Sequence, residues 1–234
     1  YWLTGGNHGR AAIRNALVRE ALGQWLLMID ADLKIVKKDY IRQYVAFISE
    51  HPHSCACCGG YRVGHGVASN LRYLYEKQSE PYQSAKVRQK TPYRNFKLSN
   101  TLVARDLLLR HPLDERIRYY GYEDVIFGMH LEKEGMLVEH IDNPVLFDRF
   151  ESNAFYIRKI EDSVKVLVSF REELKGYSSL LSLTDSAVGG VLSRFAFPIL
   201  SLLRNRFRAN LLSSRPSLVA LRFYKLYLLL NQLS

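Results

Sequence analysis

Hydrophobic residues along the first three quarters of the chain follow two different periods. Short apolar runs predict strands at residues 25–29, 54–63, 99–104 and 137–141. Recurrence every three to four residues predicts helices at residues 7–22, 71–77, 122–134 and 153–174, and a further helix that begins at Asp39. Helices that alternate with short apolar strands indicate an α/β fold, in which helices cover the faces of a sheet.

Two segments carry more specific predictions. The helix that begins at Asp39 is expected to bury one face, formed by Ile41, Tyr44, Val45 and Ile48. Residues 79–97 lack periodicity and contain five basic residues. Long polar segments of this kind in compact domains are usually functional or mobile loops.

Composition and charge narrow the class of protein. The chain has 234 residues, of which 47% are hydrophobic and 24% charged, which is typical of a globular domain and excludes a disordered chain. The formal net charge of +10 favours an acidic partner: nucleic acid, anionic lipid or a phosphorylated substrate. No apolar run reaches the roughly 18 residues of a membrane-spanning helix.

The last fifth of the chain is basic and rich in leucine. No acidic residue follows Asp185, whereas seven arginines and lysines do. This composition resembles an interfacial amphipathic helix, so we expect contact with an anionic membrane surface. Two alternatives stay open, since these residues could pack on the rest of the domain or pair with another copy of the chain.

Three cysteines lie close together, at positions 55, 57 and 58. An odd number in one cluster does not form a disulfide framework, which favours a reducing, cytoplasmic setting. Together with His51, His53 and His65 they could be taken for a zinc site, but the spacing fits no standard zinc pattern. Alternation in a half-buried strand explains the cysteines better.

The strongest chemical signal is the pair Asp30 and Asp32, which follows the apolar run 25–29. Ligands bind at the carboxyl ends of strands in open α/β sheets, and alternation predicts that both carboxylates face one cleft. Two such carboxylates repel unless a cation lies near them, and Mg²⁺ or Mn²⁺ would serve, particularly with substrate phosphates. A solvated turn with two surface aspartates is the alternative.

A second acidic pair, Glu123 and Asp124, begins the helix 122–134. Acidic residues also favour this position because they interact with the helix dipole. The aromatic run 119–122 before them would suit a sugar ring, however. A carboxylate held beside a cleft can act as a general base toward an acceptor hydroxyl.

Together these motifs resemble family-2 glycosyltransferases of the A-type fold. The matching positions are Asn7, Gly9, Arg10, Arg14 and Asn15; Ala21, Gly23, Trp25, Asp30 and Asp32; Gly121, Glu123, Asp124 and Phe127; and the segment 140–145. The resemblance implies a Rossmann-like mixed sheet flanked by helices over residues 1–175, followed by the helical tail 176–234. Family members begin with a strand-helix-strand unit that is not found here, so we expect an N-terminally truncated enzyme.

The resemblance also implies roles for individual residues. Asp124 would be the catalytic base, supported by Glu123. The donor would be bound by Asn7, Arg10, Arg14, Asp30 and Asp32, and the acceptor by Ser99, Asn100, Tyr120 and Tyr122. Asp32 would bind Mg²⁺ or Mn²⁺. Phe147 stands where many members have a metal-binding histidine, and Asp148 is the neighbouring candidate ligand.

The sequence therefore predicts an inverting glycosyltransferase. It would move a sugar from a nucleotide-diphosphate donor to a glycan or lipid-linked acceptor, as in surface polysaccharide synthesis. We expect it in the cytoplasm, peripheral to the inner face of the cell membrane. The alternative is a non-catalytic fragment or a nucleic-acid-binding protein that acts through its basic tail.

Overall fold

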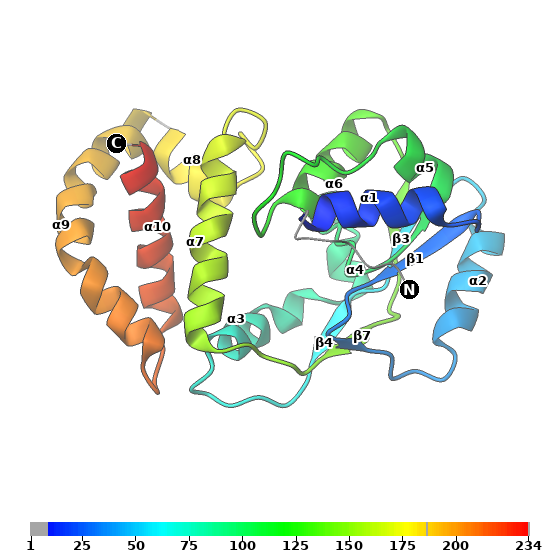
Figure 1. Cartoon of the computed structure of the whole chain (residues 1–234), viewed down its shortest axis with the longest axis horizontal. Coiled ribbons are helices and arrows are strands. Elements are labelled where there is room, and N and C mark those ends of the chain that lie inside the picture. Colours follow the sequence, from blue (N-terminus) through cyan, green and yellow to red (C-terminus); the bar gives the residue numbers. More distant parts are fainter. Residues whose placement is uncertain (1–8, 186, 234) are drawn as a thin grey trace. The chain divides into compact units, whose positions relative to one another are not determined.

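The computed structural model describes residues 9–185 and 187–233, which form two compact units (Figure 1). The first unit contains the residues through Gly64 and the segments Ser79–Arg118 and Glu123–Arg149. The second contains His65–Gln78, Tyr119–Tyr122 and the residues from Phe150 onward. The domain boundary predicted at residue 175 concerns function and stays a prediction. The two compact units are separated at the other positions given above.

A four-stranded mixed sheet forms the centre of the first unit. Its strand order is β1 (Trp25–Ile29), β5 (Asn100–Ala104), β3 (Ala56–Cys58) and β6 (Val138–His140). Strand β5 is antiparallel to β1 and β3, and β3 is parallel to β6. The carboxyl ends of β1, β3 and β6 therefore meet the amino end of β5 at one edge. The mixed sheet expected from the sequence is confirmed.

A second, three-stranded sheet has the order β2 (Leu33–Lys34), β7 (Val145–Phe147) and β4 (Tyr61–Val63). The single strand predicted over residues 54–63 is therefore two strands, β3 and β4, in different sheets. Gly59 and Gly60 separate them. Gly60 has a φ of +76°, and a Cβ on Gly59 would collide with the Tyr44 hydroxyl, so glycine is needed for this turn.

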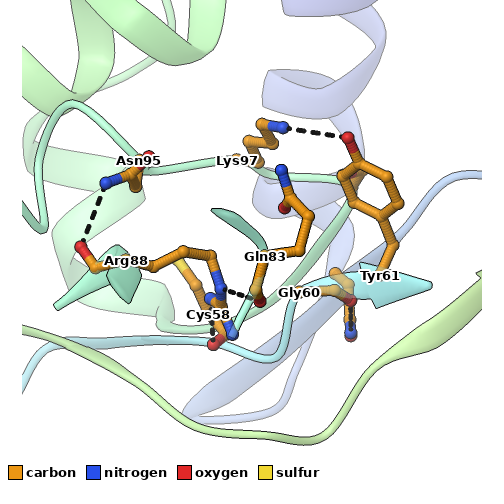
Figure 2. A pocket seen from close by; sticks show the side chains of 9 residues that line it. Cys58, Gly60, Tyr61, Gln83, Arg88, Asn95 and Lys97 are labelled. Carbon is orange, nitrogen blue, oxygen red and sulfur yellow. Dashed lines mark hydrogen bonds between the residues drawn. The ribbon is translucent and has the colours of Figure 1, made fainter. Parts of the chain in front are cut away.

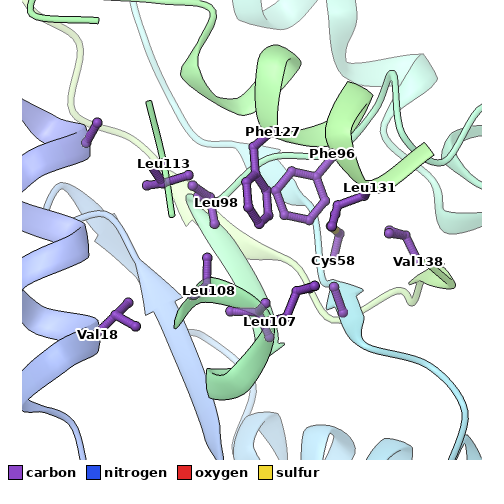
Figure 3. Packing of buried hydrophobic residues seen from close by; sticks show 13 residues of the cluster. Val18, Cys58, Phe96, Leu98, Leu107, Leu108, Leu113, Phe127, Leu131 and Val138 are labelled. Atoms are coloured by element: carbon purple, nitrogen blue, oxygen red, sulfur yellow. The ribbon is translucent and has the colours of Figure 1, made fainter. Parts of the chain in front are cut away.

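Helices cover both faces of the four-stranded sheet, as alternation along the strands requires. Val103 on β5 faces a core formed with α1 (Arg10–Glu20), α5 (Arg105–Arg110) and α6 (Glu123–Lys133), shown in Figure 3. Leu102, the next residue, faces the opposite core, formed with α2 (Tyr40–Glu50). The side chains of β5 thus alternate between two apolar layers.

The buried face of α2 matches the prediction only in part. Tyr44 is buried and Ile48 packs against the core as expected, but Tyr40 and Phe47 are also buried, and Ile41 and Val45 are exposed. Hydrogen bonds as well as apolar contacts determine which face of α2 is buried, because the hydroxyls of Tyr40 and Tyr44 donate hydrogen bonds to Asn100 inside the protein. The hydrophobic pattern included Tyr44 and left out Tyr40, because hydrophobicity alone does not show which tyrosine finds a buried hydrogen-bond partner.

The segment 79–97 is also more ordered than its polarity suggests. It contains the 3-10 helix η1 (Glu80–Tyr82) and the short helix α4 (Ala85–Arg88). Buried Arg88 fastens it to the sheet by donating to the carbonyls of Gln83, Cys58 and Ile141 at 2.9, 3.0 and 2.8 Å. Burial lowers the pKa of His140 to about 4, so its neutral ring can accept a further hydrogen bond from Arg88.

The second unit is helical. It contains most of α3 (Leu71–Ser79), together with α7 (Asn153–Ser169), α8 (Ser179–Asp185), α9 (Ala187–Leu212) and α10 (Leu218–Leu233). Helix α10 packs on both α7 and α9 around a core that includes Tyr156, Leu200 and Leu221. The C-terminal helices expected from the sequence are therefore present. Within the described residues, no helix has both the length and the apolar character to cross a bilayer.

Candidate functional site

The chain turns sharply where β1 ends. The backbone N–H of Asp30 donates to the carbonyl of Ser99 at 3.2 Å, and the Asp30 carbonyl accepts from the N–H of Leu33 at 3.1 Å. This turn leaves Asp32 exposed and Asp30 half-buried. The alternation expected for an extended chain therefore stops at Asp30, and the two carboxylates take different environments.

Two arginines on α1 lie beside three of the predicted site acids. Arg10 and Arg14 are four residues apart, which places them on one face of the helix. Arg14 Nη2 donates to Asp30 Oδ1 at 2.7 Å. Arg14 Nη1 lies 3.6 Å from Glu123 Oε1 and 3.8 Å from Asp124 Oδ1. Through these side chains, helix α1 contacts both the end of β1 and the beginning of α6.

The other pair of predicted acids occupies the first turn of α6. Glu123 is buried and forms an ion pair with Arg10. The residues just before the helix, Gly121 and Tyr122, have φ values of +108° and +66°. A positive φ is unfavourable for tyrosine, and such strained residues often occur at functional sites.

The electrostatics of this cluster are unbalanced. Asp30, Glu123 and Asp124 bring three carboxylates against two guanidinium groups. Burial raises the pKa of Asp124 to about 6, and the negative charge of Glu123 is the second cause of the rise. Arg14 and Arg10 oppose it. The buried atoms Asp124 Oδ1 and Glu123 Oε2 have no hydrogen-bond partner among the described residues. Unsatisfied buried groups of this kind are rare in folded proteins, and a bound ligand is one explanation.

The candidate metal ligands, Asp32 and Asp148, lie at one end of the small sheet. Leu33 on β2 pairs with Phe147 on β7, so the residue before Leu33 and the residue after Phe147 come to the same end of the antiparallel pair. Asp148 Oδ2 accepts from Lys34 Nζ at 2.6 Å, and its other oxygen is buried with no hydrogen-bond partner in the described part of the chain.

These residues fit a cation only in part. The described residues hold no group of three or more His, Cys, Asp or Glu side chains placed to bind a metal. A Mg²⁺ or Mn²⁺ ion held by one or two carboxylates needs substrate phosphates and water to complete its coordination. Phe147 itself belongs to the core, where it is buried against Tyr61.

Asn100 occupies the centre of a buried hydrogen-bond network. Its Oδ1 accepts from the hydroxyls of Tyr40 and Tyr44 at 2.5 and 2.8 Å, and its Nδ2 donates to the carbonyls of Gly60 and Asn143 at 2.7 and 2.9 Å. These contacts use the two donors and two acceptor positions of the amide. Any contact with an acceptor molecule, the predicted role of Asn100, would have to replace one of them.

A small cavity lies beside this network, where β3 ends and β5 begins (Figure 2). Its empty space of about 220 Å³ includes open solvent, so it is a shallow hollow and not an enclosed pocket for a whole ligand. Its lining residues are Cys58, Gly60, Tyr61, Gln83, Arg88, Asn95, Lys97, Ser99 and Asn100. Ser99, the other predicted acceptor residue in this region, therefore lines the hollow. Its carbonyl accepts a hydrogen bond from the backbone N–H of Asp30.

The two predicted acceptor tyrosines belong to the second unit. Tyr120 accepts from Arg72 Nη1 at 3.5 Å, and the ammonium group of Lys159 lies 5.0 Å from its ring centroid. Burial raises the pKa of Tyr122, so its hydroxyl is neutral at ordinary pH. Asn7, predicted to bind the donor, lies outside the described residues.

Two features of the site were missed by sequence reasoning. Lys34 neutralises Asp148, a pairing between residues far apart in sequence that no local pattern indicates. Of the two tyrosines that hold Asn100, Tyr44 was assigned only to the buried face of its helix and Tyr40 was not assigned a role. Their spacing of four residues was visible, since Tyr40 and Tyr44 must share a helix face, but their polar partner was not.

Comparison with known proteins agrees with the fold. Residues 2–108 match the family model described as Glycosyl transferase family 2. No curated protein matches the chain. Among solved structures, Pyrobaculum calidifontis mannosyltransferase PcManGT, in complex with GDP-Man and Mn²⁺, has a TM-score of 0.50 and 16% identity. That match covers 96% of this chain and 66% of PcManGT.

Staphylococcus aureus TarS, residues 1–349, is also similar. Its TM-score is 0.47 and its identity 16%, over 98% of this chain and 72% of the TarS chain. At 16% identity, PcManGT is evidence for the fold alone, and the family model is evidence for residues 2–108. Over residues 2–108 the chain is similar to glycosyl transferase family 2, and it has the A-type fold of these enzymes.

Proposed function

We propose that the chain transfers a sugar from a nucleotide-diphosphate donor to a hydroxyl group of an acceptor, with inversion at the anomeric carbon. The observation that carries the proposal is the position of Arg14. One guanidinium group lies 2.7 Å from Asp30 at the end of β1 and 3.8 Å from Asp124 at the beginning of α6. Acids far apart in the sequence are thereby gathered at one edge of the sheet.

Asp124 is proposed as the general base. It would take the proton of the acceptor hydroxyl while the acceptor oxygen forms a bond to the anomeric carbon. The bond from that carbon to the phosphate oxygen would break, and the nucleoside diphosphate would leave with the electron pair. A pKa of about 6 keeps Asp124 largely ionised at neutral pH, yet basic enough to accept a proton. Glu123 would support it by holding Arg10.

The donor is proposed to bind along α1 and the end of β1, near Arg10, Arg14, Asp30 and Asp32. A divalent metal, when bound through Asp32 with Asp148 as a candidate second ligand, would neutralise the diphosphate. The arginines add positive charge beside the same edge. The acceptor is proposed to approach Ser99, and Tyr120 and Tyr122 stay predicted acceptor residues. Asn7 stays a predicted donor residue.

The acceptor class is proposed to be a glycan or a lipid-linked sugar in surface polysaccharide synthesis, at the cytoplasmic face of the membrane. The rival prediction, nucleic-acid binding, rested partly on the basic segment 79–97. In that segment Arg88 is buried and its hydrogen bonds go to backbone carbonyls and a histidine, whereas Lys86, Lys90, Arg94 and Lys97 are exposed. The acids gathered around Arg14 favour sugar transfer instead, because clustered carboxylates do not attract nucleic acid.

Donor binding is tested by thermal unfolding of the full chain with GDP-mannose, and in parallel with UDP-sugars, with and without Mn²⁺. A donor at about 100 times its Kd should raise the Tm by roughly 5 °C. Asp32→Ala should remove the Mn²⁺-dependent part of the rise, whereas the matched control Asp106→Ala, an exposed aspartate on α5, should keep it. A rise with DNA or RNA instead, steeply dependent on salt, would support the rival function.

A further inference from the structure

Helix α9 in the second unit carries an apolar stripe that nothing in the described chain covers. Phe195, Ile199 and Leu202 are 72%, 62% and 83% exposed. Their spacing of four and three residues puts them on one side of the helix. Isolated exposed apolar residues are ordinary, but three large ones in line form a surface.

This stripe is separate from the face by which α9 joins the protein. Its inner face already packs through Leu200 and Leu211, which are buried with residues of α7 and α10. Figure 1 shows α10 between α7 and α9, so that α9 forms the outer helix of this unit. Over residues 195–202, α9 is thus apolar on both sides, although only one side has a partner within the described part of the unit.

Positive charge continues the stripe along the helix, and further exposed arginines lie elsewhere on the same unit. Arg206 lies four residues beyond Leu202 on the same side of the helix and is exposed. Arg204, Arg215 and Arg222 are exposed as well, and the sequence contains no acid after Asp185. Arg208 has one acidic neighbour, Glu161 of α7, at 3.8 Å. The surface is therefore apolar and cationic together.

We propose that α9 docks on an anionic lipid surface, with Phe195, Ile199 and Leu202 in the boundary between headgroups and acyl chains and Arg206 among the headgroups. Helices with one apolar stripe and a basic remainder lie in the plane of such interfaces. Charge decides against a second copy of the chain as the occupant, because pairing two such surfaces would bring their arginines together. The proposal is independent of glycosyl transfer.

The test is co-sedimentation of the full chain with vesicles of phosphatidylcholine alone or with 30% phosphatidylglycerol. We expect binding to the anionic vesicles, weakened by salt, and little binding to the neutral ones. The double variant Ile199→Ser with Leu202→Ser should lower the partition coefficient by tenfold or more. Arg206→Gln should lower it about fivefold. The matched control Val67→Ser changes a similarly exposed apolar residue and should leave it unchanged.

Failure of the anionic vesicles to bind, or equal binding by the double variant and the native chain, would overturn the proposal. So would a dimer, measured by light scattering, that the double variant converts to monomer, since a second copy would then cover the stripe. Donor-dependent thermal stabilisation, measured on the same variants without vesicles, should equal that of the native chain. A loss there would indicate damage to the fold or the donor site and not to lipid docking.

Discussion

Arg14 donates a 2.7 Å hydrogen bond to Asp30, across the gap between α1 and the end of β1. The same guanidinium group is the charged neighbour nearest to Asp124 that favours its ionised form. Arg14 is therefore placed to influence both the predicted donor acid and the predicted base. Its removal should affect binding and chemistry together.

Arg14→Gln should move the acid limb of the pH-rate profile upward. A base must be ionised, so activity of the native chain should fall as the pH decreases through about 6. Arg14 lowers the pKa of Asp124, and its loss therefore raises the pH at which activity is half-maximal. The measurement is the rate of sugar transfer between pH 5 and 9. Arg19→Gln, on the same helix, serves as the control, and an unmoved acid limb would contradict the assignment of the base.

Asp124→Asn should stabilise the fold at neutral pH. A carboxyl group whose pKa rises from 3.8 to about 6 on folding destabilises the native state when it is ionised. The penalty is absent below pH 4, grows as the pH rises from 4 to 6, and reaches up to about 3 kcal/mol above 6. Urea unfolding at pH 4 and pH 8 measures it. The variant should gain stability at pH 8 and not at pH 4, and a loss at pH 8 would refute the reasoning.

These two predictions depend on a site that the sequence showed only in part. The acids were visible because each pair interrupts or begins an apolar pattern, and the strand Trp25–Ile29 was confirmed residue for residue. The sequence did not show that the two pairs of acids lie close together, because Arg14 contacts Asp30 and Asp124 from a distant segment of the chain. Local spacing showed only that Arg10 and Arg14 share a helix face.

The prediction of α2 was partly wrong for a related reason. Hydrophobicity places Ile41 and Val45 inside together with Tyr44, and leaves Tyr40 out. The structure exposes Ile41 and Val45 and buries both tyrosines, whose hydroxyls donate to Asn100 on β5. Where a buried polar network decides the packing, the partner far along the chain must be known before the buried face can be assigned.

Asn100→Ala should therefore lower the free energy of unfolding by about 3 kcal/mol or more. It would leave two tyrosine hydroxyls and two backbone carbonyls without their shared partner, and each unsatisfied buried group costs about 1–3 kcal/mol. Urea unfolding gives the value. Ser99→Ala, at the adjacent and less buried position, should change it by less than about 1 kcal/mol. Equal effects of the two variants would mean that the network contributes little.

Gly128→Ala should destabilise the protein although it raises helix propensity. Gly128 lies inside α6, where alanine normally gains about 1 kcal/mol. A Cβ here would collide with the backbone carbonyl of Tyr93, however, and press on Phe96. We expect a net loss of about 1–3 kcal/mol, measured by thermal or urea unfolding. A gain in stability would show that the segment around Tyr93 moves easily away from the helix.

The most direct test of the central claim is turnover of the nucleotide-sugar donor by Asp124→Asn, with release of nucleoside diphosphate as the readout. The native chain should release it and transfer the sugar. The variant should lose a factor of about 10² to 10⁴ in kcat while donor binding, followed by the shift in Tm, is retained. Asp106→Asn should match the native chain in both respects. Unchanged turnover in Asp124→Asn would contradict the role of this carboxylate and the glycosyl-transfer site built around it.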